Sequence, residues 1–588
     1  MNNRKPAGFN RRDFTRYAAG LGAAAALGPR FGGVARAAVN EQSAGFQALW
    51  ERIKDVRANQ VGVNEAFRAP KFGLDSGAGA TRYIVQWFNA EKQRGTVDPN
   101  YFMDKGQQLL DTTNPMSTYA MVLGTPGGDP TAVPEGLGLP AMEGGAPNPA
   151  NTFATFMYNL AKAYAGKLDT FAMWNEVEIP AGATGNGRYF TWGGSAKQYY
   201  DLVKVGAMAA KAANPGAKII TSPYSYSVDQ QAGIQGDYSQ RLPFFDAFEA
   251  AVGEDRANAA SLIDGVALNL YRNPDDLWDR AWGAIPDYGH TPDKTGFRRR
   301  LDRMGLGGKE LWITETNAMP YDDPVDGWNP GAKGNPFEMR LTLQEQPSYV
   351  WQGLAMAVAA GWNKVFWQAL QDDQPVVDEL WGLVRAHSDR DNADEGRARP
   401  AYRAFQLASR LLGDAEFTGL YVRVRPDSTL AKVRRDASRY KWGLQAVVAQ
   451  KGDLRTTVLW NRTPDPITVT VGAKGGSAVR LSPDGRGSDI SANGGRYTVE
   501  LAPASRKHPA WDPPNYFFLG GEPVIIVETG VGDHSVDISG TGPANGAFIL
   551  KDARAEDGSQ PDGNAQGDAP PSAANPSGDN VNFIGRFR

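Results

Sequence analysis

Short apolar runs alternate with longer amphipathic segments between about residue 45 and residue 415. Apolar runs of about four to eight residues predict buried strands, and apolar residues spaced by three or four positions predict helices that cover a sheet. Eight such runs predict strands at residues 60–64, 81–87, 117–124, 170–174, 218–222, 265–270, 310–314 and 364–367. Helices are predicted between them, for example at residues 151–165 and 195–213.

The number and order of these units predict the fold class. Eight βα units in succession are what a closed parallel barrel needs, and such a barrel takes about 250 residues or more when its loops are long. We therefore expect an α/β chain whose residues 39–415 form a (β/α)8 barrel, the TIM barrel. The long loops at residues 124–149 and 273–296 are rich in Gly, Pro and Asp and should lie on the functional face.

The pattern changes after a predicted helix at residues 399–412. Short β-branched runs at residues 454–461, 467–471, 496–501 and 523–528 are separated by turn residues. This pattern predicts a C-terminal antiparallel β-sandwich domain at residues 416–530. From residue 531 to residue 588, Gly, Pro, Ser, Asn and Asp dominate with few apolar anchors, so we expect a low-complexity, disordered tail.

The first 38 residues have the composition of an export signal. Paired arginines at Arg11 and Arg12 precede a weakly apolar, Ala- and Gly-rich stretch, which ends in Ala35-Arg36-Ala37. This order resembles a twin-arginine signal peptide, which the twin-arginine export machinery reads before the signal is removed. An ordinary basic tail is the alternative. We expect a protein exported to the periplasm or the extracellular space.

Composition excludes several function classes. The signal-like segment carries a formal charge of +6, which leaves −9 for the rest of a chain whose total is −3. An acidic body without a basic block argues against a nucleic-acid partner. After this segment, no stretch approaches the roughly 20 apolar residues of a membrane span. The chain has no Cys, and its four histidines are scattered, so no metal-ligating motif is present; they are His290, His387, His508 and His534.

Two short motifs carry the candidate chemistry. The first, Trp174-Asn175-Glu176, and the second, which contains Glu315, each end a predicted strand. The carboxyl ends of parallel barrel strands converge on one face, so these two carboxylates can meet although they are 139 residues apart. Pairs of carboxyl groups are what the hydrolysis of a glycosidic bond needs, one as a proton donor and the other as a nucleophile.

The sequences around the two motifs resemble glycoside hydrolases of clan A. KLDTFAMWNEVEIP at residues 167–180 is similar to their fourth strand, where the Glu of an Asn-Glu pair is the acid/base, and GKELWITETNAMP at residues 308–320 is similar to their seventh strand, which carries the nucleophile. With GATRYIVQWFN at residues 79–89, AMVLGTP at 120–126, NPGAKII at 214–220 and RPAYRAFQLASRLL at 399–412, the likeness is greatest to family 39, including its exopolysaccharide-degrading and β-xylosidase types, with family 5 as a cousin.

The resemblance implies a set of site residues. Glu176 would be the acid/base and Glu315 the nucleophile, and Asn175 resembles the residue that binds the sugar 2-hydroxyl. Tyr271 can donate to the nucleophile, while Asn269 stands where the family usually has histidine.

Two further residues are predicted from strand position and chemistry. Arg82, on the second strand, could hold Glu315 ionised by a charge-assisted hydrogen bond. Trp367, which ends the eighth strand, would form an apolar floor under the sugar.

These observations predict a retaining glycoside hydrolase that cleaves β-glycosidic bonds in an oligo- or polysaccharide and needs no cofactor. Long mouth loops and many aromatic residues favour endo-action on a polymer over the alternative of an exo-acting β-xylosidase-like enzyme. A barrel that binds carbohydrate without catalysis is a third possibility, suggested by Asn269. The sugar and the linkage are left open by the sequence.

Overall fold

The computed structural model describes residues 42–98, 101, 116–179, 191–224, 241–271, 274, 277, 281, 297–320, 322–323, 340–372, 380–386, 397–424, 442–461, 466–475, 477–504, 519–532, 536–541, 547–549 and 581–583. The predicted signal segment at residues 1–38 and all four histidines lie outside these residues. Among the described helices, none has the length and apolar character that crossing a bilayer requires.

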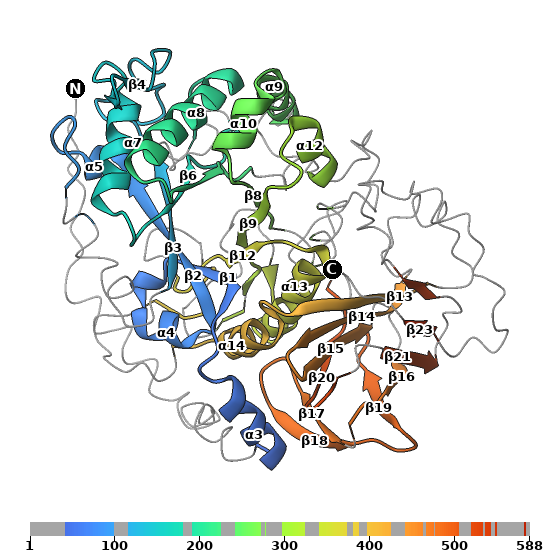
Figure 1. Ribbon diagram of the computed structural model, residues 1–588. Coiled ribbons are helices and arrows are strands. Elements are labelled where there is room, and N and C mark those ends of the chain that lie inside the picture. The colour runs from blue at the N-terminus through green and yellow to red at the C-terminus, as the bar shows by residue number, and fades with distance from the viewer. Residues whose placement is uncertain are drawn as a thin grey trace, which may run out of the picture.

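The first part of the chain forms a closed barrel, as predicted (Figure 1). Its strands pair in the order in which they occur in the chain, and the last pairs with the first. Every neighbouring pair is parallel. The barrel strands are β1 (Ala58–Asn64), β2 (Ala78–Gln86), β3 (Ser117–Leu123), β6 (Thr170–Met173), β7 (Lys218–Thr221), β8 (Gly265–Asn269), β9 (Glu310–Thr316) and β12 (Lys364–Trp367).

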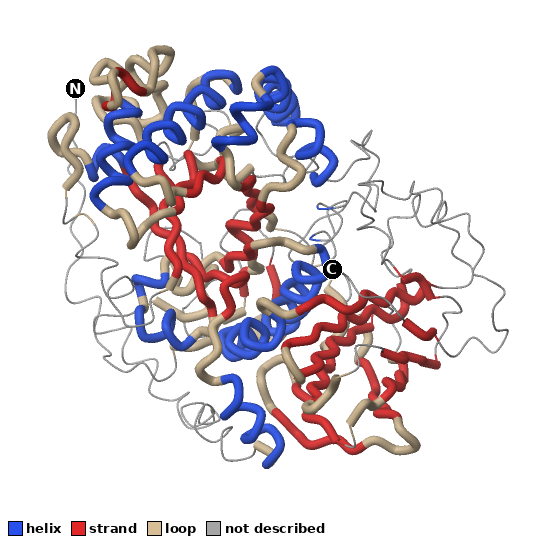
Figure 2. The backbone as a smooth tube through the Cα atoms, viewed as in Figure 1, coloured by secondary structure: helices blue, strands red, loops and turns tan. Residues whose placement is uncertain are grey.

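Helices surround this barrel on the outside (Figure 2). Two of them begin with a capping side chain: Asn151 accepts a hydrogen bond from the Ala154 N–H, and Ser195 forms a capping box with Gln198. The helical segments of the barrel region are α3 (Ala44–Ile53), η2 (Ala66–Arg68), α4 (Pro70–Asp75), α5 (Trp87–Ala90), α7 (Thr152–Ala163), α8 (Ala196–Ala213), α9 (Arg241–Glu254), α10 (Arg256–Leu262), α12 (Phe297–Met304), α13 (Gln346–Ala360) and α14 (Pro400–Leu412).

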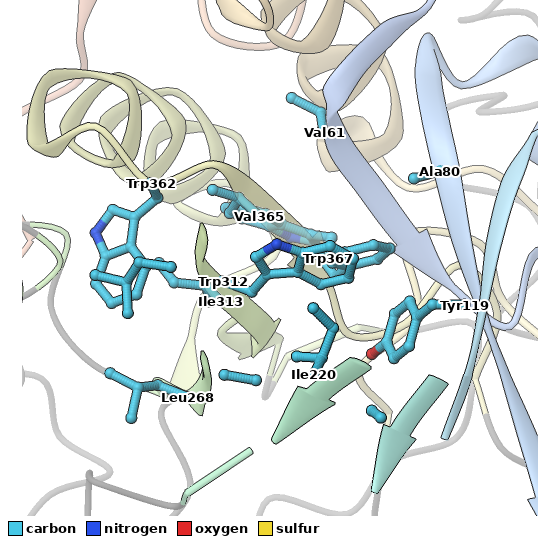
Figure 3. Close-up of a cluster of buried hydrophobic side chains, with 14 of the residues drawn as sticks. Val61, Ala80, Tyr119, Ile220, Leu268, Trp312, Ile313, Trp362, Val365 and Trp367 are labelled. Carbon is cyan, nitrogen blue, oxygen red and sulfur yellow. The ribbon is translucent and has the colours of Figure 1, made fainter. Parts of the chain in front are cut away.

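Large apolar side chains fill the barrel. Tyr119 packs against Trp312 and Phe366, with ring centroids 5.5 and 4.8 Å apart. Figure 3 shows the surrounding cluster, in which buried side chains from β1, β2, β3, β7, β8, β9 and β12 gather. The interior is therefore a packed core, and any opening for a ligand must lie at an end of the barrel.

Two antiparallel sheets follow the barrel, and their inner faces share one apolar core that includes Val448, Leu459, Val469 and Val499. This confirms the predicted sandwich. One sheet contains β13 (Glu416–Val424), β14 (Trp442–Lys451), β15 (Leu454–Asn461), β17 (Ser477–Leu481), β18 (Gly487–Ser491), β20 (Val524–Glu528) and β22 (Ala547–Ile549), and the other contains β16 (Ile467–Gly472), β19 (Arg496–Leu501), β21 (Val536–Thr541) and β23 (Val581–Phe583).

The sheets extend beyond the boundary that the sequence suggests. The predicted sandwich ends at residue 530, but β21 pairs with β16, β22 pairs with β13, and β23 pairs with β21. The expected low-complexity tail therefore contributes strands, because short apolar runs such as Ala547–Ile549 can add to a sheet edge despite their polar surroundings. Apart from Val531 and Gly532, the rest of residues 531–588 lies outside the described part of the chain.

Helix α13 joins the barrel to the sandwich. All of its residues are buried, because one face covers the barrel and another faces the sheets. The Trp351 Nε1–H donates to the Pro483 carbonyl at 3.1 Å, and the Gln352 Nε2 donates to the Gly520 carbonyl at 3.2 Å. The sandwich is thus fixed to the barrel through buried polar contacts.

Candidate active site

Glu176 lies just beyond the carboxyl end of β6. The Trp174 N–H donates to the Val122 carbonyl of β3, and the Glu176 N–H donates to the Pro223 carbonyl beyond β7. Both residues have a positive φ, +74° for Trp174 and +43° for Glu176. Non-glycine residues rarely adopt this left-handed conformation, and where they do, the site is often functional. Neighbouring strands therefore hold Glu176 in a strained backbone that turns it to the end of the barrel.

Glu315 lies at the end of β9 and is held by two donors. Arg82 of β2 forms an ion pair with Oε1 through Nη1. The Tyr271 hydroxyl donates to Oε2 at 2.7 Å. Glu315 is partly exposed, with 13% of its side chain accessible, while Arg82 is buried. The carboxylate is thus oriented from within the protein and keeps an open side.

Arg82 remains charged in this position. Burial by itself lowers the pKa of Arg82, but the charges of Glu315 and Glu65 oppose this effect and leave the pKa above its ordinary value. Arg82 Nη2 lies 3.4 Å from Glu65 Oε1, and Glu65 also pairs with Arg68 at 2.5 Å. Glu65 has a φ of +59°, so a third strained residue lies near the same end of the barrel.

Strand β8 supplies a partner to each carboxylate. The Asn269 Nδ2 donates to Glu176 Oε1 at 3.0 Å, and Asn269 is also the register partner of Glu315 on β9. Burial raises the pKa of Tyr271 well above its ordinary value, and the charges of Glu315 and Glu176 raise it further. Both carboxylates therefore act on the same phenol, and the hydroxyl of Tyr271 stays protonated and can donate a hydrogen bond.

Asn175 and Asn269 lie together beside Glu176. Asn269 is fully buried, and its Oδ1 accepts from the Thr314 hydroxyl at 2.9 Å. Its Nδ2 lies 3.5 Å from Asn175 Oδ1. Asn175 is 8% exposed. The structure thus brings Glu176, Glu315, Asn175, Arg82, Tyr271 and Asn269 into one connected group.

Trp367 lies outside this group of residues, so the prediction that it forms an apolar floor under the sugar is wrong. Successive residues of a strand point to opposite sides, and Phe366 already faces the barrel interior. Trp367 therefore faces outward, where it packs against Tyr349 of α13 and Phe405 of α14 and is fully buried. A sugar at the mouth cannot contact this ring.

Two residues that the sequence did not single out lie at the site instead. Gln368 accepts a hydrogen bond from Arg82 Nη2 at 3.0 Å, and Trp381 lies against Tyr271 with ring centroids 4.8 Å apart. Asn317 connects the two, because its Nδ2 donates to the backbone carbonyls of both. No local pattern in the sequence links Gln368 to Arg82 or Trp381 to Tyr271, so only the tertiary structure brings these two residues to the site.

Within the described ranges, no group of three or more His, Cys, Asp or Glu residues is arranged to hold a metal ion. The assembled groups are two partly exposed carboxylates, one buried cation, a phenol and several amides. Such groups can donate and accept protons, attack an electrophilic carbon and bind hydroxyl groups.

Fold and site together define a class: a parallel βα barrel with paired carboxylates at the carboxyl ends of its strands. No protein-family model matches the chain. No curated protein matches it either.

Several solved structures are similar to this chain. One is a family 39 glycoside hydrolase from Bacteroides cellulosilyticus WH2, with 14% identity and a TM-score of 0.46 over 81% of this chain and 82% of that one. Another is a GH30 endoxylanase from Clostridium papyrosolvens, with 11% identity and a TM-score of 0.44 over 81% and 97%. A bifunctional glucanase-xylanase from a metagenome library has 13% identity and a TM-score of 0.44 over 82% and 98%. Because all three TM-scores are below 0.5, we base the function on the site geometry of this chain.

Proposed function

We propose that this protein is a retaining glycoside hydrolase that cleaves β-glycosidic bonds, with Glu315 as the nucleophile and Glu176 as the acid/base. The observation that carries the proposal is the asymmetry between the two carboxylates. Glu315 faces the Arg82 cation and the Tyr271 hydroxyl, whereas Glu176 accepts from the neutral amide of Asn269. The Arg82 ion pair and the Tyr271 hydrogen bond orient both oxygens of Glu315 for attack on a carbon, and the Asn269 amide can donate to Glu176 whether that group is a carboxylate or a carboxylic acid.

The reaction follows from these roles. A carboxylate oxygen of Glu315 forms a bond to the anomeric carbon while the bond from that carbon to the leaving oxygen breaks, and Glu176 gives its proton to that oxygen. Glu176 then takes a proton from water, whose oxygen displaces Glu315 from the anomeric carbon. Both carboxyl groups return to their starting states, so the cycle needs no cofactor.

Covalent trapping tests the nucleophile. Incubation with activated 2-deoxy-2-fluoro β-glycosides of xylose, glucose and galactose should add one sugar to the protein, and peptide mass analysis should locate it at Glu315. A Glu315→Gln variant serves as the control and should stay unmodified. Absence of labelling by a broad panel of sugars would favour the alternative of a barrel that binds carbohydrate without catalysis.

The leaving group tests the acid/base. Glu176→Ala should lower the rate by about 100- to 10,000-fold on alkyl glycosides, whose leaving oxygen needs a proton, and by much less on 2,4-dinitrophenyl glycosides. Equal losses on both substrates would contradict the role of Glu176 as acid.

We also propose a polysaccharide as the substrate, cleaved internally. Residues 124–150 leave the carboxyl end of β3 and contain the hairpin of β4 (Met142–Glu143) and β5 (Ala146–Pro147), which adds chain at the end of the barrel where the carboxylates lie. Product analysis on a polysaccharide library distinguishes the modes. Oligosaccharides of mixed length are expected, whereas release of single sugars would indicate exo-action.

Export by the twin-arginine machinery is a further part of the proposal. It rests on Arg11 and Arg12 ahead of the Ala- and Gly-rich stretch. An Arg11→Lys, Arg12→Lys double variant should remain inside the producing cell, while the parent chain should be found outside the cytoplasm and shortened by about 38 residues.

A further inference from the structure

Gln368 has an unusual place beside the two carboxylates. It follows β12 directly and is partly exposed, while its neighbours Trp367 and Ala369 are buried. The predicted aromatic floor is absent from this position because the indole of Trp367 lies behind the barrel wall. A side-chain amide therefore occupies the end of the strand.

The contacts of Gln368 fix which end of its amide faces the protein. A guanidinium only donates hydrogen bonds, so the atom that lies 3.0 Å from Arg82 Nη2 must be the oxygen, Oε1. The Asn64 Nδ2 donates to the same oxygen at 2.8 Å. Asn64 is itself oriented, because its Nδ2 also donates to the Thr314 carbonyl at 2.8 Å. Asn64 and Arg82, which donate to Gln368, are register partners on the neighbouring strands β1 and β2.

This orientation leaves the other end of the amide available. With Oε1 occupied by two donors, the two N–H groups of Nε2 have no acceptor among the described residues. Nε2 is also not among the buried polar atoms that lack a partner. Its hydrogens are therefore offered to solvent or to a bound molecule.

The amide is close to the reacting atoms. Arg82 binds Glu315 through Nη1 and Gln368 through Nη2, so one planar guanidinium spans the distance between the nucleophile and the amide. The Gln368 side chain therefore lies beside the place where a sugar attacked by Glu315 would bind. The acceptors that such a sugar presents are hydroxyl oxygens.

We propose that Gln368 is a substrate-binding residue whose Nε2 donates a hydrogen bond to a hydroxyl oxygen of the sugar attacked by Glu315. The inference rests on the proposed glycosidase function and adds a specificity determinant to it. A site that bonds a hydroxyl discriminates against an analogue that lacks it, because the buried donor is then left unpaired. An aromatic floor would instead bind the apolar face of the sugar and tolerate the loss of one hydroxyl.

The test combines one variant with a set of substrates. Gln368→Met keeps the length of the side chain and removes the Nε2 donor together with the Oε1 that accepts from Arg82 and Asn64. The effect of the lost acceptor should be the same on every probe, so only the part of the loss that depends on one hydroxyl reports on Nε2. Gln371→Met is a matched control, because Gln371 also accepts from an arginine, Arg397, at 2.6 Å, whereas the arginine that binds Glu315 is Arg82. The probes are 2,4-dinitrophenyl β-glycosides of xylose, glucose and galactose, together with derivatives that lack one hydroxyl each.

In the parent enzyme, removal of the contacted hydroxyl should lower kcat/KM by about 3- to 10-fold. Gln368→Met should show a similar loss on the complete sugar and no further loss when that one hydroxyl is removed, while the other hydroxyls keep their effects. Gln371→Met should behave like the parent on every probe. The thermal unfolding midpoint of Gln371→Met should stay close to that of the parent, whereas that of Gln368→Met should fall modestly, because Arg82 and Asn64 lose an acceptor.

Two results would overturn the inference. If Gln368→Met lowers kcat/KM by the same factor on every probe, or not at all, Gln368 binds no hydroxyl, although labelling of Glu315 in the parent would leave the glycosidase function standing. If the parent neither hydrolyses any probe nor is labelled at Glu315, the glycosidase function and the role of Gln368 fail together.

Discussion

The barrel and the sandwich each contain a glutamate that is bonded to one arginine and one tyrosine. In the barrel, Arg82 pairs with Glu315, which accepts from the Tyr271 hydroxyl. In the sandwich, Arg455 pairs with Glu528, which accepts from the Tyr497 hydroxyl at 3.2 Å. The chemical groups are the same, so any difference in role must come from their surroundings.

The surroundings differ in how completely they enclose the carboxylate. Glu528 is 1% exposed and also accepts from the backbone N–H groups of Lys474 and Gly475, so both of its oxygens are satisfied by the chain. Glu315 is 13% exposed and lies at the end of a strand. A buried and fully bonded carboxylate can only support the fold, whereas an oriented and partly open one can react. The comparison suggests that enclosure separates the structural from the reactive group.

Removal of the reactive carboxylate should have the largest effect. Glu315→Ala should lower kcat on the order of 10,000-fold or more, because no other group can form the covalent intermediate. The thermal unfolding midpoint should fall only moderately, because the buried Arg82 loses one anion but keeps Glu65 as a second anionic partner at 3.4 Å. Steady-state kinetics and calorimetry on the same preparation check both statements. Full loss of folding with loss of activity would make Glu315 a structural residue like Glu528.

The matching change in the sandwich should affect stability instead. Glu528→Ala leaves Arg455 buried without its anion, which costs about 3–5 kcal/mol of unfolding free energy. A double variant, Arg455→Met with Glu528→Leu, should recover much of this loss, because the unpaired charge is gone. Chemical denaturation measures the difference. Activity per folded molecule should equal that of the parent, and a selective loss of activity would contradict the comparison.

Loss of the phenol should have a smaller effect on rate. Tyr271→Phe removes one hydrogen bond to a charged group and should lower kcat/KM by about 10- to 100-fold. Because burial and the nearby carboxylates raise the pKa of Tyr271, its hydroxyl stays protonated in alkaline solution. The alkaline limb of the pH profile should therefore be unchanged in the variant, and a limb that moves would assign it to Tyr271. Tyr497→Phe is the control and should leave the rate unaltered.

A third buried cluster tests whether the burial of a carboxylate, rather than its location in the barrel or the sandwich, determines whether it is structural or reactive. Asp323, in the barrel part of the chain, pairs with Arg385 at 2.9 Å and Arg399 at 2.8 Å and is 1% exposed. Burial alone raises the pKa of Asp323, but the two arginines outweigh it and hold the pKa below its usual value. The cluster should then contribute stability above about pH 4, where the unfolded chain is ionised, and lose it as the pH falls further.

Asp323→Asn should therefore unfold at a lower temperature than the parent at pH 7, and the gap should narrow towards pH 3. Thermal scans across this range measure it. The rate of hydrolysis should stay the same, because Asp323 is bonded to Arg385 and Arg399, whereas Glu315 is oriented by Arg82 and Tyr271. A gap of equal size at both pH values would show that the carboxylate charge of Asp323 is not what stabilises the fold.

Much of the fold could be predicted because local patterns report burial directly. Each of the eight apolar runs became a barrel strand, and the strand Lys364–Trp367 has the predicted bounds. The end of the sandwich could not be predicted, because β21 and β23 are short strands in polar surroundings and are stabilised by the sheet edge that they join. Pairing between distant segments has no local signal.

The candidate site divides in the same way. The positions of Glu176 and Glu315 could be predicted from the sequence, because the carboxyl ends of all barrel strands lie on one face of the barrel. The position of Trp367 at a strand end predicts a sugar-binding role. Because Phe366 faces the barrel interior, however, the next side chain, Trp367, faces outward. Trp381 and Gln368 gain their places only from contacts with Tyr271 and Arg82.

The amino-acid sequence by itself determined which segments are strands and helices and which acidic groups end those strands. Periodic burial is a local property, so a linear pattern records it. Only the tertiary structure decided which arginine faces which carboxylate, which aromatic ring is sealed behind the barrel wall, and which amide is left with free hydrogens. These depend on the closure of the barrel, which brings Asn64 and Arg82 of the first two barrel strands into contact with Gln368 after the last one.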